Sequence, residues 1–207
     1  MGLRKNVLEK IIEKIPLHPK PKIEFEQYLT PGNIVAELVF DSYLSLKYED
    51  VVVVDLGCGT GRFAIASALL SPSHVVCVDI DYEALKVAME YASKLNVKEL
   101  IDFVQASLPT FNLSKVDVVF QNPPFGVHRR HADLMFLNSA LRLKPKIIYT
   151  IHKSNENTRK LIAKICSEKS YVAKILATKT ITIPPYMEHH FKMKHKVLVD
   201  LYKIVKK

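Results

Sequence analysis

The sequence predicts an α/β fold built on a doubly wound, mostly parallel sheet. Short apolar runs rich in β-branched residues recur along the chain, as expected of strands buried on both faces. Stretches with helical spacing lie between them, and this alternation implies right-handed crossovers with helices on both faces of the sheet. The expected strands are residues 51–54, 75–78, 116–120 and 147–151.

A helix is expected after each of these strands. In the segment 81–95, Asp81 is a suitable N-cap and apolar residues follow at three- and four-residue spacing. The other expected helices cover residues 61–70, 133–141 and 155–167.

The two ends of the chain depart from this alternation. Residues 7–15 have the pattern of an amphipathic helix and lead into a Pro-rich link, and Thr30 followed by Pro31 predicts an N-cap and first turn for a helix reaching Leu46. At the other end, residues 171–183 and 196–204 are expected to form an antiparallel hairpin appended to the sheet.

Length and composition limit the class of protein. The 207 residues are 48% hydrophobic and 25% charged, which predicts one packed domain of ordinary size. Three cysteines without a CxxC pair offer neither a disulfide framework nor a four-ligand zinc site, so we expect no metal and a reducing, cytoplasmic location. We see no apolar run long enough for a membrane span and no signal peptide.

The net charge of +9 is unevenly distributed. Residues 1–143 contain 15 basic and 17 acidic side chains, a net of −2, whereas residues 144–207 contain 15 basic and 4 acidic, a net of +11. Such asymmetry indicates a polyanionic partner, nucleic acid or an anionic membrane surface. A solvated lysine-rich face is the alternative.

A glycine-rich turn follows the first expected strand, in the segment DLGCGTG at 55–61. Glycines at alternate positions, Gly57, Gly59 and Gly61, allow a sharp turn and let a ligand lie against bare main chain. A dinucleotide fingerprint would need glycine where Arg62 stands. A tight turn without a ligand would also use glycine.

Two carboxylates accompany this turn. Asp55 precedes it and suits an ammonium group or a loop amide, and Asp79 closes the second strand, where it is the expected acceptor for two ribose hydroxyls. A ligand with a ribose and a cationic amino-acid tail fits both, and S-adenosylmethionine is such a ligand.

The strand at 116–120 leads directly into a candidate reaction loop, Asn122-Pro123-Pro124-Phe125. Two prolines stiffen the chain and remove amide donors, so the loop presents carbonyl and side-chain acceptors. The Asn122 side-chain oxygen and the Pro123 carbonyl could accept the hydrogens of an exocyclic amine such as adenine N6 and localise its lone pair, while Phe125 stacks on the base. A proline-rich turn without function is the alternative.

With DLGCGTG and NPPF, the chain resembles the S-adenosylmethionine-dependent methyltransferases that modify exocyclic amines. The segments EQYLTP (26–31), ADLMFL (132–137) and IHKSN (151–155) make it most similar to the small-subunit ribosomal RNA adenine-N6 methyltransferases of archaea and eukaryotes. The resemblance implies a single domain over 1–207. It would have a helical N-terminal lid at 1–46 and a Rossmann-like core at 47–207 with a seven-stranded sheet.

The resemblance also implies site residues and a partner. Ser107 stands where many relatives place an aspartate that binds the cofactor adenine, so this contact would be weaker. Eukaryotic relatives pair with a small zinc-binding activator protein, which would be a partner here. The expected cofactor-binding residues are Gln27, Thr30, Asp55, Gly57, Gly59, Thr60, Gly61, Arg62, Asp79, Ser107 and Asn122.

Basic residues near the reaction loop and in the basic tail, residues 144–207, are candidates for RNA binding. Some follow the loop at once, and others alternate with aromatic residues in the tail, a combination suited to phosphate contacts and stacking. An exposed loop without function is the alternative. The candidates are His128, Arg129, Arg130, Lys153, Lys192, Lys194 and Lys196.

Together these features favour methyl transfer from S-adenosylmethionine to an adenine N6 in structured RNA, and we expect this RNA to be ribosomal. Two rival functions stay open. One is a glutamine N-methyltransferase acting on a protein, which has less need of a basic tail. The other is an RNA-binding assembly factor that has kept the fold and lost turnover, against which the reaction loop is intact.

Overall fold

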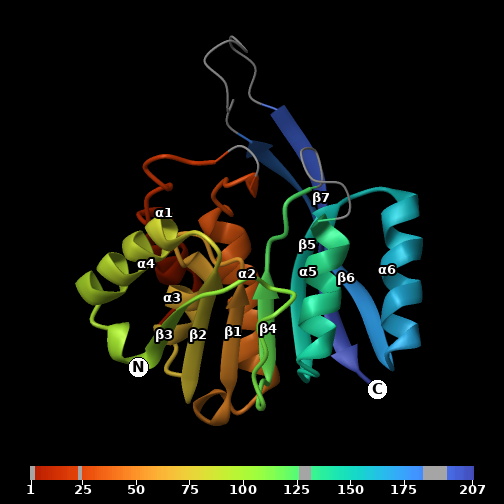
Figure 1. Cartoon of the computed structure of the whole chain (residues 1–207), viewed down its shortest axis with the longest axis horizontal. Coiled ribbons are helices and arrows are strands. Elements are labelled where there is room, and N and C mark those ends of the chain that lie inside the picture. Colours follow the sequence, from red (N-terminus) through yellow and green to blue (C-terminus); the bar gives the residue numbers. More distant parts are fainter. Residues whose placement is uncertain (1–2, 23–24, 126–131, 184–194) are drawn as a thin grey trace.

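A computed structural model describes residues 3–22, 25–125, 132–183 and 195–207. Its seven-stranded sheet has the order β3-β2-β1-β4-β5-β7-β6 (Figure 1). The strands are β1 Val52–Leu56, β2 His74–Asp79, β3 Ile101–Gln105, β4 Val118–Gln121, β5 Ile147–Lys153, β6 Tyr171–Ile183 and β7 His195–Lys206. The helices are α1 Lys5–Glu13, α2 Gly32–Ser45, α3 Arg62–Ala68, α4 Tyr82–Lys94, α5 Ala132–Arg142 and α6 Glu156–Glu168.

The pairing confirms a mostly parallel sheet with an antiparallel hairpin. The strands β3, β2, β1, β4 and β5 pair in parallel, and β7 pairs antiparallel with both β5 and β6. Because β7 lies between β5 and β6, the second strand of the hairpin is the one that joins the hairpin to the parallel part of the sheet.

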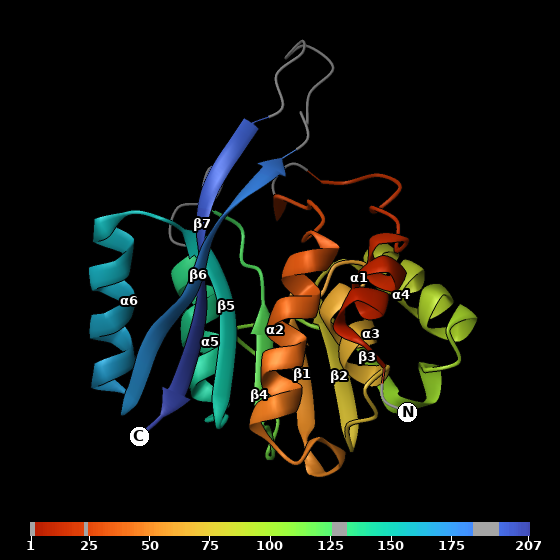
Figure 2. The ribbon, with the colours of Figure 1, turned by 180° about the vertical axis from the view of Figure 1, so that it is seen from behind.

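Both faces of the sheet are buried, as the apolar runs predict. Successive residues of a strand point to opposite faces, so Val53 belongs to the core under α1–α4 and Val54 to the core under α5 and α6. The same alternation separates Tyr149 from Ile148 in β5. Figure 2 shows α1 and α2 on one face, whereas α5 and α6 are in front of the other face in Figure 1.

Local differences from the expected elements have physical reasons. Thr30 does not cap α2: Pro31 stands at the N-cap, its carbonyl accepts the first helical amide bonds, and the Thr30 hydroxyl is occupied elsewhere. The strand Ile101–Gln105 was not among the expected apolar runs, because it lies at the sheet edge and has exposed polar positions. Asp81 does cap α4, accepting a hydrogen bond from the Glu83 amide at 3.2 Å.

The hairpin of β6 and β7 extends beyond the carboxyl ends of the parallel strands (Figures 1 and 2). A fully buried carboxylate, Asp200 of β7, anchors it to its neighbours. Asp200 accepts hydrogen bonds from Arg159 of α6 at 2.8 and 3.0 Å and from Thr178 of β6 at 2.7 Å. The hairpin is therefore fixed to α6 as well as to β5.

The turn between β1 and α3 depends on the conformation of glycine. Gly61 has φ of +81°, and a Cβ atom there would lie 2.9 Å from the Cβ of Ala88 in α4. The Gly61→Ala substitution should therefore combine backbone strain with a clash between α3 and α4. We expect urea denaturation to show a loss of at least about 2 kcal/mol in the free energy of unfolding.

Gly59→Ala is the matched control for this prediction. Gly59 also has a positive φ, +54°, but among the residues that the structure describes, a Cβ there would meet nothing within 4 Å beyond its own chain neighbours. This variant should lose only the strain of about 1–2 kcal/mol. Equal losses in the two variants would contradict the clash at Ala88.

Candidate active site

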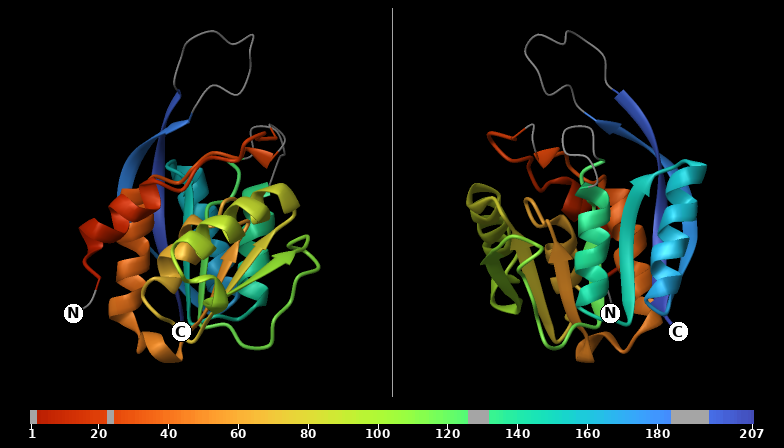
Figure 3. Two further views of the ribbon diagram at one scale, coloured as in Figure 1. Left: turned by 90° about the vertical axis from the view of Figure 1, so that its left-hand side faces the viewer. Right: turned by 45° about the vertical axis from the view of Figure 1, so that its right-hand side comes forward.

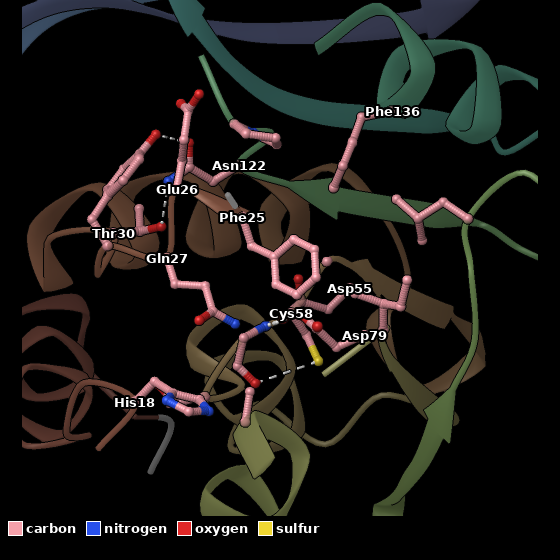
Figure 4. A pocket seen from close by; sticks show the side chains of 18 of the residues that line it. His18, Phe25, Glu26, Gln27, Thr30, Asp55, Cys58, Asp79, Asn122 and Phe136 are labelled. Carbon is pink, nitrogen blue, oxygen red and sulfur yellow. Dashed lines mark hydrogen bonds between the residues drawn. The ribbon is translucent and has the colours of Figure 1, made fainter. Parts of the chain in front are cut away.

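A pocket opens at the carboxyl ends of the parallel strands. It is lined by the glycine loop after β1, by Asp79 and Ile80 at the end of β2, by residues 106–109 after β3 and by Asn122 and Pro124 after β4. The start of α5 and residues 17–18 and 25–30 close it. The segment joining α1 to α2 thus reaches across the edge of the sheet, and most of the expected cofactor-binding residues meet here (Figures 3 and 4).

The glycine loop is held against β2 by its own amides. The Gly57 and Cys58 amides donate to the Val78 carbonyl at 2.8 and 3.0 Å, and the Gly59 amide donates to Asp79 Oδ2 at 2.7 Å. Because no atom of the described residues, apart from Gly59 and its chain neighbours, lies within 4 Å of a Cβ position on Gly59, this part of the structure leaves space beside it for a ligand. A side chain on Gly57, by contrast, would collide with Phe136.

The two expected carboxylates line the pocket and are both buried. Asp55 Oδ2 accepts a hydrogen bond from the Ala64 amide of α3 at 2.9 Å. Burial, opposed by the Ala64 hydrogen bond and helped by the nearby Asp79 charge, raises the pKa of Asp55 to about 8. Burial also raises the pKa of Asp79, although amides of Asp81 and Gly59 oppose the shift. A cationic ligand would favour the charged form of both carboxyl groups and so lower their pKa values.

The donor set fits S-adenosylmethionine. Asp55 and Asp79 would hold its ammonium and ribose, and the open side of Gly59 leaves room beside the main chain. The Thr60 hydroxyl is buried and has no hydrogen-bond partner in the described part of the chain, so it is available to a ligand. Ser107 lines the pocket near Ala106 and Leu108, where the resemblance expects the adenine contact.

Residues of the N-terminal segment form the rim near α4. Gln27 Nε2 donates to Asp81 Oδ2 at 2.9 Å, and Lys22 Nζ lies 3.3 Å from Asp81 Oδ1. Burial alone would raise the pKa of Asp81, but the hydrogen bonds from Gln27 and Lys22 hold it below its ordinary value. Gln27 therefore lines the pocket while its amide joins the segment to α4.

Arg62 holds the N-terminal segment in place. Its guanidinium is buried and donates to the Thr30 and Ile15 carbonyls, each at 2.8 Å, and to the Glu13 carbonyl at 3.3 Å. Arg62 also lines the pocket, as expected of a cofactor residue, but its hydrogen bonds go to carbonyls of this segment and of the end of α1, and to the Glu13 carboxylate at 3.4 Å. The glycine pattern in the sequence shows that Arg62 stands where a dinucleotide fingerprint would have its third glycine, but it does not predict these contacts with the N-terminal segment.

The reaction loop meets the N-terminal segment through Asn122. Its Nδ2 donates to Thr30 Oγ1 at 2.9 Å, and its Oδ1 accepts from the Tyr28 hydroxyl at 3.3 Å. Glu26 accepts a hydrogen bond from the Phe125 amide at 2.5 Å. Figure 4 shows Glu26, Thr30 and Asn122 at one rim, with Asp55 and Asp79 across the pocket. Glu26 and Tyr28 were not among the expected site residues, although both stand in EQYLTP.

A buried polar chain supports the reaction loop from the α5 side of the sheet. Gln121 Nε2 donates to Thr150 Oγ1 at 3.0 Å, and Thr150 Oγ1 lies 2.9 Å from His152 Nε2. His152 Nδ1 is 3.9 Å from Asp133 Oδ2, and the nearby imidazole lowers the pKa of Asp133. Thr150 and His152 flank Ile151 at the start of IHKSN, so this segment contributes structure next to the site.

The candidate RNA-binding residues are only partly described. Lys153 lies at the carboxyl end of β5 with Nζ 5.9 Å from the centre of the Phe125 ring, and Lys196 is exposed on β7. His128, Arg129, Arg130, Lys192 and Lys194 lie outside the described residues.

Neither a metal cluster nor a membrane helix is found in the part of the chain that the structure describes. There, His, Cys, Asp and Glu side chains form no group of three or more able to hold a metal ion. Cys58, Cys77 and Cys166 are buried free thiols, and burial raises the pKa of each. No described helix is both long and apolar enough to span a bilayer.

Comparisons with known proteins place this site in a family. The family model "Methyltransferase domain" matches residues 47–201. The rRNA N(6)-adenosine-methyltransferase of Drosophila melanogaster is 31% identical over 98% of this chain and 96% of its own length. An uncharacterised protein of Methanocaldococcus jannaschii is 35% identical over 99% of this chain and 95% of its own length.

A solved structure agrees. A crystal structure from Pyrococcus horikoshii, named as a candidate RNA methyltransferase, superimposes with a TM-score of 0.87 at 35% sequence identity. The match covers 100% of this chain and 98% of the other. The expected Rossmann-like methyltransferase fold is confirmed.

The contacts of Arg62 predict that Arg62→Met loosens the N-terminal segment. The substitution leaves buried carbonyls of Ile15 and Thr30 without donors, so we expect a loss of about 3 kcal/mol in the free energy of unfolding. Hydrogen exchange should accelerate in residues 4–22 and 25–30, as measured by mass spectrometry.

Arg142→Met is the matched control, because Arg142 donates to the Leu108 and Phe111 carbonyls, away from the N-terminal segment. It should leave exchange in that segment unchanged. If Arg62→Met weakened only cofactor binding and left hydrogen exchange unaltered, Arg62 would bind the cofactor and would not hold the N-terminal segment in place.

Proposed function

Since the chain belongs to the methyltransferase domain family and is a relative of the Drosophila enzyme over nearly its whole length, we propose that it methylates ribosomal RNA. The reaction transfers a methyl group from S-adenosylmethionine to the N6 amine of an adenine. One observation carries the proposal: Asn122 of NPPF lies at the same pocket as the glycine loop and both carboxylates. The fold alone would not supply an acceptor for an amine at this place.

The residues of the pocket divide into two groups with different tasks. When bound, S-adenosylmethionine supplies an electrophilic methyl group on a sulfonium. Asp55 binds the ammonium and Asp79 the ribose hydroxyls, while the main chain at Gly57 and Gly59 and the Thr60 hydroxyl contact the rest of the cofactor. Gly61, Ser107, Gln27 and Thr30 complete the proposed cofactor site, and Arg62 contributes to it by holding the N-terminal segment against the pocket.

The reaction loop prepares the amine. Adenine N6 is a poor nucleophile because its lone pair is delocalised into the ring. Asn122 Oδ1 and the Pro123 carbonyl accept its two hydrogens and favour the geometry that localises this pair, and Phe125 stacks on the base. Pro124 keeps the loop rigid. The amine proton passes to water after transfer, so no charged base is needed.

The basic tail and the residues after the loop bind RNA in this proposal. Lys153 lies beside Phe125, where it would reach a phosphate flanking the flipped base. His128, Arg129, Arg130, Lys192, Lys194 and Lys196 complete the proposed RNA-binding residues. We place the protein in the cytoplasm, as one domain over 1–207 with residues 1–46 as its lid segment. A small zinc-binding activator stays a prediction.

The substrate can be tested directly. Small-subunit ribosomal RNA incubated with the protein and isotope-labelled S-adenosylmethionine should yield N6-methyladenosine after digestion to nucleosides and mass spectrometry. Label in a release-factor glutamine and none in RNA would favour the glutamine methyltransferase. RNA binding without any methyl transfer would favour the assembly factor.

The Asn122→Ala variant tests the role of the reaction loop. We expect kcat for RNA methylation to fall at least about 100-fold, because the side-chain oxygen acts on the amine in the transition state. Affinity for S-adenosylmethionine, measured by isothermal titration, should stay within about tenfold. Asn138→Ala, an exposed asparagine of α5, is the control and should retain turnover. Undiminished turnover in Asn122→Ala would exclude the assigned role.

The raised pKa of Asp55 predicts proton release when the cofactor binds. With its pKa at about 8, Asp55 is mostly protonated at pH 6.5, and a cationic ammonium favours the carboxylate. Affinity should therefore rise with pH below about 7.5, by up to about tenfold per unit. Isothermal titration at pH 6.5 in buffers of different ionisation enthalpy would measure the released proton. Asp55→Asn should reduce this buffer dependence by the part that Asp55 contributes, and a wild-type protein without any buffer dependence would contradict the prediction.

A further inference from the structure

Tyr28 makes the two contacts that the proposed function assigns to the target adenine. Its hydroxyl donates to Asn122 Oδ1 at 3.3 Å, where the N6 amine would donate. Its ring lies 5.3 Å from the Phe125 ring at an angle of 30°, where the base would stack. We propose that Tyr28 occupies the target-base position in the free enzyme and is displaced when the base enters. This inference rests on the proposed function.

The neighbours of Tyr28 fix the reaction loop while leaving this position to Tyr28. Glu26 and Thr30, two residues away on either side, contact the same loop: Glu26 accepts from the Phe125 amide, and Thr30 Oγ1 accepts from Asn122 Nδ2. Glu26 and Thr30 are 9% and 8% exposed. Because Thr30 engages the amide nitrogen of Asn122, the amide oxygen is turned towards Tyr28. Glu26 and Thr30 can therefore stay in place when the base arrives.

The burial of Phe125 shows that something must move. Phe125 is only 8% exposed, with Tyr28 packed against it and Lys153 Nζ 5.9 Å from its ring centre. A base cannot stack on a covered ring. Movement of Lys153 would expose only the ring, whereas movement of Tyr28 exposes the ring and the Asn122 oxygen together. Of the two described side chains against the ring, Tyr28 is therefore the one that the base replaces.

The exchange would replace each contact with one of its own kind. In the free enzyme Tyr28 keeps the Asn122 oxygen hydrogen-bonded and Phe125 shielded, as polar and aromatic groups in a pocket require. The N6 amine of an incoming adenine would donate to the Asn122 oxygen in place of the Tyr28 hydroxyl. The adenine ring would stack on Phe125 in place of the Tyr28 ring. The free energy needed to break the contacts of Tyr28 with Asn122 and Phe125 therefore weakens RNA binding by that amount.

Kinetics of Tyr28→Phe test the hydroxyl contact. This variant keeps the ring and removes one hydrogen bond, so the KM for small-subunit ribosomal RNA should fall about two- to tenfold. Affinity for S-adenosylhomocysteine should change less than twofold. Tyr43→Phe, on the exposed side of α2, is the control and should leave the KM unchanged. A higher KM or a lower kcat in Tyr28→Phe would show that Tyr28 assists the bound base and would overturn the proposal.

A fluorescent reporter follows the displacement without turnover. The chain contains no tryptophan, so Tyr28→Trp supplies a single indole at this position. With S-adenosylhomocysteine bound, addition of small-subunit ribosomal RNA should shift its emission to the red and increase quenching by acrylamide. The Tyr43→Trp control should not respond. An emission at position 28 that is unmoved or shifted to the blue would overturn the proposal.

Fluorescence anisotropy of labelled RNA separates the two levels of failure. If the RNA does not bind, both the proposed function and the proposal that Tyr28 occupies the target-base position are wrong. If the RNA binds and the indole at position 28 does not respond, only the proposal about Tyr28 is wrong.

Discussion

The parallel register of β1 and β4 is the constraint on which the site depends. Leu56 of β1 pairs with Gln121 of β4, so the glycine loop and the reaction loop leave the sheet at the same level. Two motifs more than 60 residues apart in the sequence thereby face one pocket. A shift of one residue in this pairing would turn every side chain of the strand to the opposite face, and the buried alternation of Val53 and Val54 prevents such a shift.

The N-terminal segment adds a third wall that the sheet cannot provide. Arg62 binds its main chain at Ile15 and Thr30, and this leaves Glu26, Tyr28 and Thr30 facing the reaction loop. Gln27 contributes on the α4 side through Asp81. One segment therefore contacts both the cofactor side and the reaction side of the pocket, which gives a physical route by which the two could influence each other.

The structure refines the meaning of the basic tail. Several of its cations neutralise acidic residues of the first two-thirds: Lys146 pairs with Asp117 at 2.8 Å, and Lys203 with Asp41 at 2.6 Å. Lys179 similarly lies 3.2 Å from Glu37. The pairs of Lys179 and Lys203 join the hairpin to α2, and the Lys146–Asp117 pair joins the residues that precede β5 and β4, so only part of the excess charge is free for the proposed RNA contacts. Lys196 is exposed and belongs to the free part.

The sequence by itself determined the motifs and every strand of the sheet except the edge strand Ile101–Gln105, because β-branched runs, glycines and prolines act through local backbone preferences. It also predicted that Asp55, Asp79 and Asn122 would meet, since parallel strands end at one edge. Only the tertiary structure assigned the contacts of Arg62, Thr30, Glu26 and Tyr28. Their partners lie between 32 and 99 residues away in the chain, and no local pattern specifies which donor and acceptor will meet over that distance.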